Sequence, residues 1–301
     1  MAKNSVVTLD LNFQNKSQAI ASYLIRDGDA VVLVESGPGS CLAGLEAGLR
    51  TNGLSLADVT HVLLTHIHLD HAGASGRLAR NGAQIYVHPL GASHLLNPEK
   101  LLASATRIYG ERMESLWGEF LPVAEKQLHV TEDAEEIVIG NLRFVALSTP
   151  GHAEHHNVYA FEDICFSGDV GGVRMPGYPY LRVPMPPPEL HIEKWRATLN
   201  RLRGQKFAYI APTHFGIFDD VEWHLREIEK GLDSAERWLE ATMPSDPSVE
   251  EMRASFSAWI EAEGRAQGLS ADTVKSYGLA NPLGMSADGL MRYWRKVRMA
   301  G

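Results

Sequence analysis

The sequence is poor in cysteine, with only Cys41 and Cys165 among its 301 residues. A disulfide framework is therefore not part of the design, and both side chains are expected to be small residues of the core. Long apolar runs are also missing, and none approaches the roughly 20 residues that a membrane-spanning helix needs. The first residues, Met1 to Ser5, do not lead into the apolar segment typical of a secretory signal. We expect a cytoplasmic protein without a membrane partner.

Basic residues are outnumbered, because 28 Lys and Arg face 37 Asp and Glu and give a formal net charge of -9. A nucleic-acid-binding surface normally needs a basic face that replaces phosphate counterions, and the sequence contains no cluster of Lys and Arg. Hydrophobic residues make up 45% of the chain, which is enough to bury a large core. We therefore expect a small-molecule substrate and no nucleic-acid partner. Whether the chain forms a homodimer is left open by the sequence.

Apolar segments with a period of two predict strands, and apolar residues at helical spacing predict helices between them. Strands are expected at residues 6–13, 19–25, 30–34, 61–64, 83–87, 128–139, 142–148, 163–166 and 207–211. Helices are expected after residue 40 and at residues 55–59, 71–80, 97–120, 192–202, 221–239, 249–259, 271–277 and 286–297. Asp27-Gly28 is a hairpin signal between the second and third strands. This order of elements favours an α/β protein.

Potential metal ligands are concentrated in one short segment, directly after the apolar strand at 61–64 and before a predicted helix. The ligands are therefore expected on a strand-to-helix turn. Imidazole nitrogens and a carboxylate oxygen suit a borderline divalent cation such as zinc, manganese or ferrous iron. A single histidine in a loop would carry little weight, but this spacing is unusual. The residues are His66, His68, Asp70 and His71.

Three later strands also end in a residue of metal-binding type. They are followed by His152, Asp169 and His214. In layered α/β folds, ligand sites form beyond the ends of strands, where several loops converge. Seven side chains from four strand ends would then meet at one edge of the sheets. A random distribution of loop residues would not produce this pattern.

The order of these motifs resembles the signature of the metallo-β-lactamase fold superfamily of hydrolases. The resemblance rests on His66-x-His68-x-Asp70-His71, then a lone His after Pro-Gly, an Asp after Gly and a final His, and it spans roughly residues 6 to 220. It implies a four-layer αββα sandwich for residues 1–220, followed by a helical C-terminal extension at 221–301. The extension is expected either to cover the site or to make a dimer contact.

The same resemblance implies two divalent metal ions per chain, with zinc as the first expectation and iron or manganese as alternatives. By the family pattern, one ion would be held by His66, His68 and His152, and the other by Asp70, His71 and His214, with Asp169 bridging the two. A hydroxide shared by the two cations would be the nucleophile. Asp70 would orient this hydroxide and take up or relay a proton.

Other side chains have weaker claims. Glu35 stands in Glu35-Ser36-Gly37, where relatives usually have Asp-Thr-Gly, so a supporting role beside the metals is carried over only weakly. His156 is expected to support a metal-binding histidine, and His155 is equally well read as a plain loop residue. The loop residues Arg174, Tyr178, Tyr180 and Arg182 are read as surface residues that would bind an anionic group only if the loop folds over the metals. His61, His88, His94, His129, His191 and His224 are read as structural or solvent-facing.

The predicted function is hydrolysis of a small ester-type substrate, such as a lactone, a thioester, a carboxylic ester or a phosphoester. Secreted β-lactamases of the family place a Cys in the second site, whereas Cys165 lies inside a strand four residues before Asp169. One alternative is an iron-dependent oxidoreductase of the same fold, similar to persulfide dioxygenases. Another is a relative without catalytic activity.

The helical segment at 97–120 is read as core packing, and its aromatic residues are candidates for a pocket wall.

Overall fold

The computed structural model describes residues 5–299 and contains two β-sheets. The first sheet has the order β1-β2-β3-β4-β5-β6, and the second has the order β11-β10-β9-β8-β7. The first comprises β1 (Val6–Asp10), β2 (Ala21–Asp27), β3 (Ala30–Val34), β4 (His61–Leu63), β5 (Gln84–Val87) and β6 (Leu128–Val130). The second comprises β7 (Glu135–Ile139), β8 (Leu142–Ser148), β9 (Asn157–Phe161), β10 (Ile164–Phe166) and β11 (Tyr209–Ala211). The expectation about Met1 to Ser5 falls largely outside the described residues.

Each sheet combines antiparallel hairpins with parallel strands. In the first sheet, β1, β2 and β3 pair antiparallel, and β3 to β6 pair parallel. The hairpin between β2 and β3 turns at Gly28, whose φ of 55° is a conformation that glycine adopts without strain. In the second sheet, β7 to β10 are antiparallel and β11 joins β10 in parallel. Parallel strands align their carboxyl ends, so the loops after β4, β10 and β11 can converge.

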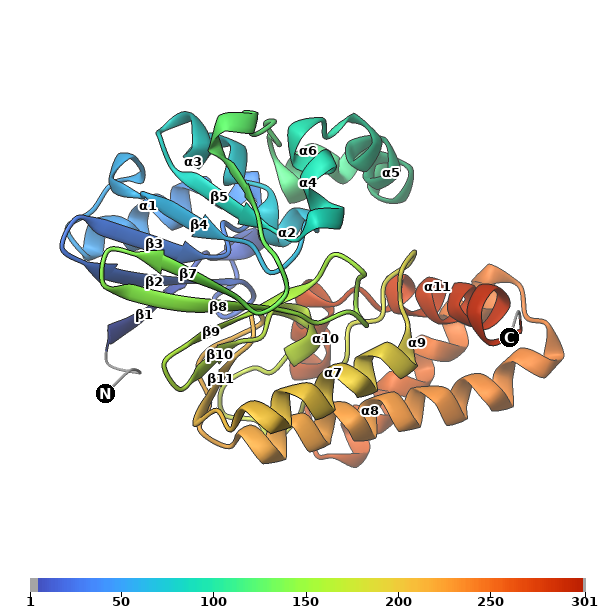
Figure 1. The fold of residues 1–301 in the computed structure, drawn as a ribbon. Helices are drawn as coiled ribbons and strands as arrows, with labels where there is room; N and C mark the ends of the chain where they lie inside the picture. The colour runs from blue at the N-terminus through green and yellow to red at the C-terminus, as the bar shows by residue number, and fades with distance from the viewer. Residues whose placement is uncertain (1–4, 300–301) are drawn as a thin grey trace.

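The two sheets pack face to face, and helices cover both outer faces (Figure 1). The core between the sheets includes Ile25, Val34, Phe144 and Phe166, which are all fully buried or nearly so. On the outer face of the first sheet lies α1 (Leu42–Thr51). On the outer face of the second sheet lie α7 (Ile192–Gln205) and α8 (Val221–Thr242), as their shared core with that sheet shows. The predicted four-layer αββα fold is confirmed.

Several element boundaries differ from the prediction for local reasons. The predicted helix at 71–80 is divided into α2 (Leu69–Ala72) and α3 (Ser75–Arg80). Between them lies Gly73, where an added Cβ would come within 2.7 Å of the backbone of Pro38. The predicted strand at 6–13 ends at Asp10, because the carboxylate of Asp10 accepts hydrogen bonds from the backbone of Asn12 and Gln18 and turns the chain.

The predicted helix at 97–120 is also divided. It consists of α5 (Glu99–Tyr109), a short 3-10 turn at 110–112, and α6 (Met113–Trp117), and it is preceded by α4 (Pro89–Leu96). Gly110 and Gly118, with φ of 54° and 64°, terminate the two helices. The short segment predicted as a helix at 55–59 is a 3-10 turn, which Ser55 and Asp58 cap reciprocally.

The C-terminal part of the chain is helical, as predicted. After α8 follow α9 (Val249–Ala266), α10 (Ala271–Ala280) and α11 (Leu283–Tyr293). Side chains of α8, α9 and α11 share one buried cluster with the outer face of the second sheet. The division into domains at residue 220 stays a prediction. No helix within residues 5–299 is both long enough and apolar enough to cross a membrane.

Candidate metal centre

The seven predicted ligands lie together at the carboxyl ends of the strands. The loop after β4 carries His66 and His68, and the short helix α2 carries the two ligands that follow them. The loop after β8 contributes one histidine, the 3-10 turn after β10 contributes an aspartate, and the segment after β11 contributes the last histidine. The structure thus joins residues from both sheets at one edge of the sandwich. The full set is His66, His68, Asp70, His71, His152, Asp169 and His214.

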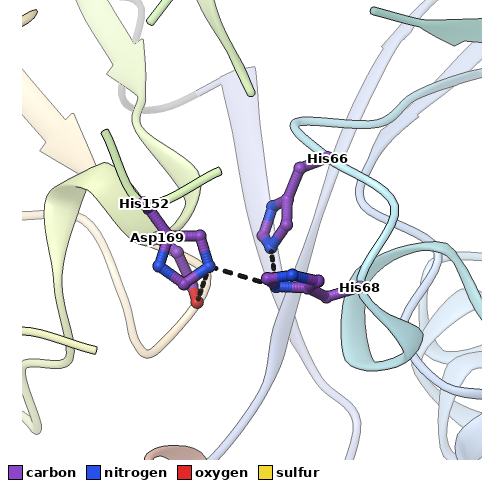
Figure 2. Close-up of side chains that lie close together, drawn as sticks. All are labelled: His66, His68, His152 and Asp169. Atoms are coloured by element: carbon purple, nitrogen blue, oxygen red, sulfur yellow. Dashed lines mark hydrogen bonds and ion pairs between the residues drawn. The ribbon is translucent and has the colours of Figure 1, made fainter. Parts of the chain in front are cut away.

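Four of these residues form the first cluster (Figure 2). Nδ1 of His68 lies 2.9 Å from Nε2 of His66 and 3.1 Å from Nε2 of His152. Nε2 of His152 lies 3.3 Å from Oδ2 of Asp169. Figure 2 shows that His66 and His68 approach from the β4 loop and that the other two residues approach from the opposite side. All four offer a ligand atom to one small volume.

The second cluster contains Asp70, His71 and His214. Oδ2 of Asp70 lies 3.7 Å from Nε2 of His71 and 3.5 Å from Nε2 of His214. Oδ1 of Asp169 lies 3.3 Å from both of these nitrogens. Since Oδ2 of the same carboxylate faces the first cluster, Asp169 has one oxygen directed to each cluster. This is the position that a bridging carboxylate would occupy.

The second nitrogen of most of these imidazoles is held by a hydrogen bond. Nδ1 of His152 donates to the carbonyl oxygen of Pro184 at 3.0 Å, and Nδ1 of His214 donates to the carbonyl oxygen of Ala19 at 2.8 Å. Nδ1 of His71 donates to Oε1 of Glu35 at 3.0 Å. A donor bond of this kind fixes the ring and its tautomer, and leaves Nε2 facing the centre.

Glu35 is fully buried below the centre and supports two of its histidines. Its carboxylate accepts hydrogen bonds from the hydroxyls of Thr65 and Thr213 as well as from His71. The Thr65 hydroxyl donates its hydrogen bond to Glu35 and accepts one from Nδ1 of His66 at 3.0 Å. Glu35, His66 and His71 also lie close enough to hold an ion. Because the carboxylate is already occupied, we assign Glu35 to orienting histidines, as the sequence suggested weakly.

Burial and neighbouring charges shift the pKa values of the candidate ligands in different directions. Burial and the adjacent imidazole of His152 together lower the pKa of His68 to about 3, although the carboxylates of Asp70 and Asp169 oppose the shift. Burial alone would also lower the pKa of His71, but the carboxylates of Asp70 and Asp169 outweigh it and raise that pKa well above its usual value. Burial would raise the pKa of Asp169, yet the charges on His71 and His214 hold it well below its usual range. The carboxylates are therefore kept ionised at neutral pH.

The residues fit a pair of divalent cations. Nε2 of His71, Nε2 of His214 and Oδ1 of Asp169 are buried and have no hydrogen-bond partner in the described residues. Buried polar atoms without partners are rare and destabilising, and a bound ion would satisfy all three. The donor set of imidazoles and carboxylates, without a thiolate, suits zinc, iron or manganese and does not discriminate between them.

A cavity of about 250 Å³ opens onto this centre. Its wall includes the candidate ligands His68, Asp70, His152 and Asp169. The remainder is formed largely by apolar side chains of the segment at 99–117 and of the segment at 279–285. The helical insertion thus packs in the core, as predicted, and also forms a pocket wall. Of the C-terminal helices, the end of α10 and the start of α11 contribute to this wall, and a dimer contact stays a prediction.

Three histidines outside the ligand set also lie near the centre. His156 is buried, stacks on His66 with ring centroids 5.0 Å apart, and has Nδ1 within 2.9 Å of the Thr149 hydroxyl, so it supports the site as expected. His155 lines the cavity and is more than a plain loop residue. His94 is predicted to be structural or solvent-facing, but it lines the cavity too. No spacing signal identifies His94, because it lies alone on α4.

The loop after Asp169 does not present its arginines to the cavity. Arg174 is paired with Asp220 at 2.6 Å and stacks on Phe218, and Arg182 lies over the ring of Tyr277. Both arginines are at least nine-tenths buried, so the prediction that they are surface residues is wrong. Tyr180 is buried as well, whereas Tyr178 is exposed. None of the four lines the cavity.

Comparisons with known proteins agree with this geometry. The family model described as Metallo-beta-lactamase superfamily matches residues 18–214, which is well over half of the chain. The metallo-beta-lactamase fold-containing protein ST1585 of Sulfurisphaera tokodaii is 24% identical over 216 residues, which cover 69% of this chain and 78% of that protein. The range matched by the family model includes all seven residues of the two clusters.

Solved structures extend the likeness in fold. The metallo-beta-lactamase family protein TTHA1429 from Thermus thermophilus is similar with a TM-score of 0.68 and 21% identity, over 97% of this chain and 94% of that one. The Rm3 metallo-beta-lactamase is similar with a TM-score of 0.57 and 16% identity, over 76% of this chain and 90% of that one. At such identities the likeness speaks for the fold alone. Taken together with the match over residues 18–214, these findings show that the chain belongs to the metallo-beta-lactamase superfamily.

Proposed function

We propose that the protein is a metal-dependent hydrolase with two divalent cations per chain, acting on small ester-type substrates. The observation that carries this proposal is the position of Asp169, whose two carboxylate oxygens face different clusters of buried ligands. In this proposal His66, His68 and His152 hold one cation, and Asp70, His71 and His214 hold the other. Zinc is the cation we expect first.

When bound, a pair of divalent cations supplies Lewis-acid chemistry, which activates water as a nucleophile near neutral pH and stabilises negative charge on the substrate's oxygen. The remaining chemistry falls to the protein. Asp70 lines the cavity, and 18% of its side chain is exposed. Its carboxylate can orient the attacking water and accept or relay the proton that the water loses. The buried carboxylate of Glu35 accepts hydrogen bonds from His71 and Thr213 and so keeps the neighbouring imidazoles in place during the reaction.

The first test is the metal content and activity of the purified chain. Elemental analysis of protein prepared without chelator should give about two equivalents of transition metal per chain. A panel of lactones, thioesters, aryl esters and phosphotriesters, assayed with defined metals, should show hydrolysis of at least one class. Absence of bound metal from such a preparation, or metal-loaded protein that hydrolyses none of the four classes, would overturn the proposal.

The role of Asp70 is tested with a matched pair of variants. Asp70→Ala should lose most of the activity while the fold, measured by circular dichroism, survives. Asp29→Ala removes an exposed carboxylate from the turn between β2 and β3 and should leave the rate unchanged. Equal rates in the two variants would remove Asp70 from the mechanism.

A further inference from the structure

The cavity beside the metal centre has an apolar part that the ligands do not explain. One wall is formed by α5 and α6, through Leu101, Ile108 and Trp117. The opposite wall is formed by Leu279 and Met285, from the end of α10 and the start of α11. The two walls come from segments far apart in the sequence, and the polar edge of the space between them is the metal centre. A molecule bound there would have its reactive group at the ligands and an apolar group between the helices.

Ile108 shows that this wall is open to a ligand. Its side chain lines the cavity, yet 46% of the residue remains exposed. Exposed apolar surface inside a concave site is what an apolar ligand group covers, with a gain in free energy proportional to the area removed from water. Single exposed apolar residues are common on protein surfaces, but Ile108 belongs to a cavity wall that it shares with Leu101 and Trp117.

Outside the ligand set, the cavity lining offers few basic side chains to an anionic substrate. Among the lining residues within the described chain, Lys100 is the only lysine or arginine, and it stands on the exposed side of α5. Two divalent cations would offset the carboxylates of the candidate ligands Asp70 and Asp169, so the charged lining side chains outside the ligand set are Lys100 and Glu189. The arginines of the neighbouring loop are engaged elsewhere, as described above. Phosphate esters that carry a negative charge are usually bound by arginine or lysine side chains, and this lining supplies almost none.

We infer that the substrate is an uncharged carboxylic ester, thioester or lactone whose apolar acyl chain lies between α5 and the segment at 279–285. This inference rests on the proposed hydrolase function and narrows it to acyl compounds. A cavity volume of about 250 Å³ is small for a ligand site, so we expect the acyl chain of the substrate to be of short or medium length.

The test is a series of acetyl, butyryl, hexanoyl and octanoyl esters of one alcohol, assayed with zinc-loaded protein. Each methylene that enters the cavity should raise kcat/KM by about fourfold, until the cavity is full. Ser104→Phe places a large ring into the cavity from α5 and should reduce kcat/KM for hexanoyl and octanoyl esters while sparing the acetyl ester. Arg107→Ala, an exposed position on the same helix that does not line the cavity, is the matched control and should keep the wild-type chain-length profile.

A binding measurement separates this inference from the proposed function. Non-hydrolysable N-methyl amides of the same acyl series, titrated by calorimetry, should bind more tightly with each methylene in wild-type protein and less so in Ser104→Phe. Hydrolysis with a flat chain-length profile, or amide binding independent of chain length, would overturn the inference while leaving the hydrolase proposal intact. Chain-dependent amide binding without hydrolysis of any ester would instead support the pocket and contradict the hydrolase. A preference for charged phosphoesters would contradict the inference directly.

Discussion

His224 lies inside α8 and is completely buried, although it is not one of the predicted ligands. Its Nε2 donates to the carbonyl oxygen of Gly171 at 2.6 Å, and its Nδ1 accepts from Arg174 at 3.3 Å. Its pKa is lowered to about 4, mainly by burial and also by the charge of Arg174, while the Gly171 carbonyl and Asp220 oppose the shift. The folded protein therefore holds His224 in its neutral form under most conditions.

This histidine should make stability depend on pH. As the pH falls below about 6.5, the unfolded chain gains a proton on His224 that the folded chain does not bind, so the free energy of unfolding falls until about pH 4. A shift of this size corresponds to roughly 3 kcal/mol at the lower limit. Urea unfolding of wild type and His224→Gln should show their stability difference shrinking as the pH is lowered from 7 to 4. Parallel curves over that range would contradict the assignment.

At the residue scale, the sequence predicted candidate ligands that the structure brings together, but it did not predict what holds them. The spacing of His66, His68, Asp70 and His71 is visible in the chain because these side chains must have particular chemistry. Their supports include the carbonyl oxygens of Ala19 and Pro184, and a backbone carbonyl is present at every residue. No pattern of residue types can therefore identify such acceptors.

At the scale of elements, α11 holds the proline-rich loop that orients one ligand. Pro184 accepts the bond from His152, and the backbone N–H of the next residue, Met185, donates to the hydroxyl of Ser286 at 3.1 Å. Gly289, one turn further along α11, lies directly against the same loop, and an added Cβ would come within 1.9 Å of the Met185 carbonyl oxygen. The helix and the loop can approach this closely only because position 289 has no side chain.

Gly289→Ala should therefore weaken one metal site without unfolding the protein. The added methyl group must displace the backbone of the loop, which loosens the support of His152. Loss of such support typically costs about 10- to 100-fold in metal affinity. Competition with a chelator should show one equivalent released more easily and the other held as in wild type.

Gly284→Ala on the same helix is the matched control for this experiment. A Cβ there would meet only the flexible side chain of Arg253, at 3.8 Å. This variant should retain both equivalents with wild-type affinity. If Gly289→Ala also binds both as tightly as wild type, α11 does not support the ligand.

Elements with strong periodicity were predicted well, and their contacts were not. The long helix expected at 221–239 is present as α8, and the hairpin at Gly28 forms as expected. The segment at 97–120 was predicted as one helix, and its division depends on two glycines with positive φ. Its apolar positions serve both the core and the cavity. A periodic apolar stripe indicates that a face is covered, but it does not indicate whether protein or ligand covers it.

At the scale of the whole molecule, the candidate metal centre draws its side chains from both sheets. The ligands at 66–71 follow a strand of the first sheet, whereas His152, Asp169 and His214 follow strands of the second. A cation held by both groups binds the folded state and not the unfolded chain, so it should stabilise the entire sandwich. For each site, the gain is about 2.7 kcal/mol when free metal exceeds its dissociation constant about 100-fold.

Removal of metal should therefore lower the melting temperature. Dialysis against a chelator should decrease Tm by several degrees, and addition of zinc should restore it. Asp169→Ala lacks the carboxylate that faces both clusters, so zinc should raise its Tm less than it raises that of metal-free wild type. An identical Tm for chelated and zinc-loaded wild-type protein would show that no ion joins the sheets.

The overall fold could be predicted because the order of motifs resembles that of the metallo-β-lactamase fold superfamily. This resemblance implied the four-layer sandwich, and the structure has that arrangement. The position of the helices after residue 242 could not be predicted in the same way. Their apolar faces fit any complementary surface, and only the three-dimensional structure places the turn at 279–285 beside the ligands.

That placement has a consequence for a chain under synthesis. The ribosome completes the last of the seven candidate ligands at His214, well before it adds Leu279 to Met285, which close the far side of the cavity. Synthesis therefore supplies every candidate ligand before it supplies this part of the cavity wall. A chain that stopped short of Leu279 would keep the seven candidate ligands and lack the apolar surface contributed by Leu279 and Met285.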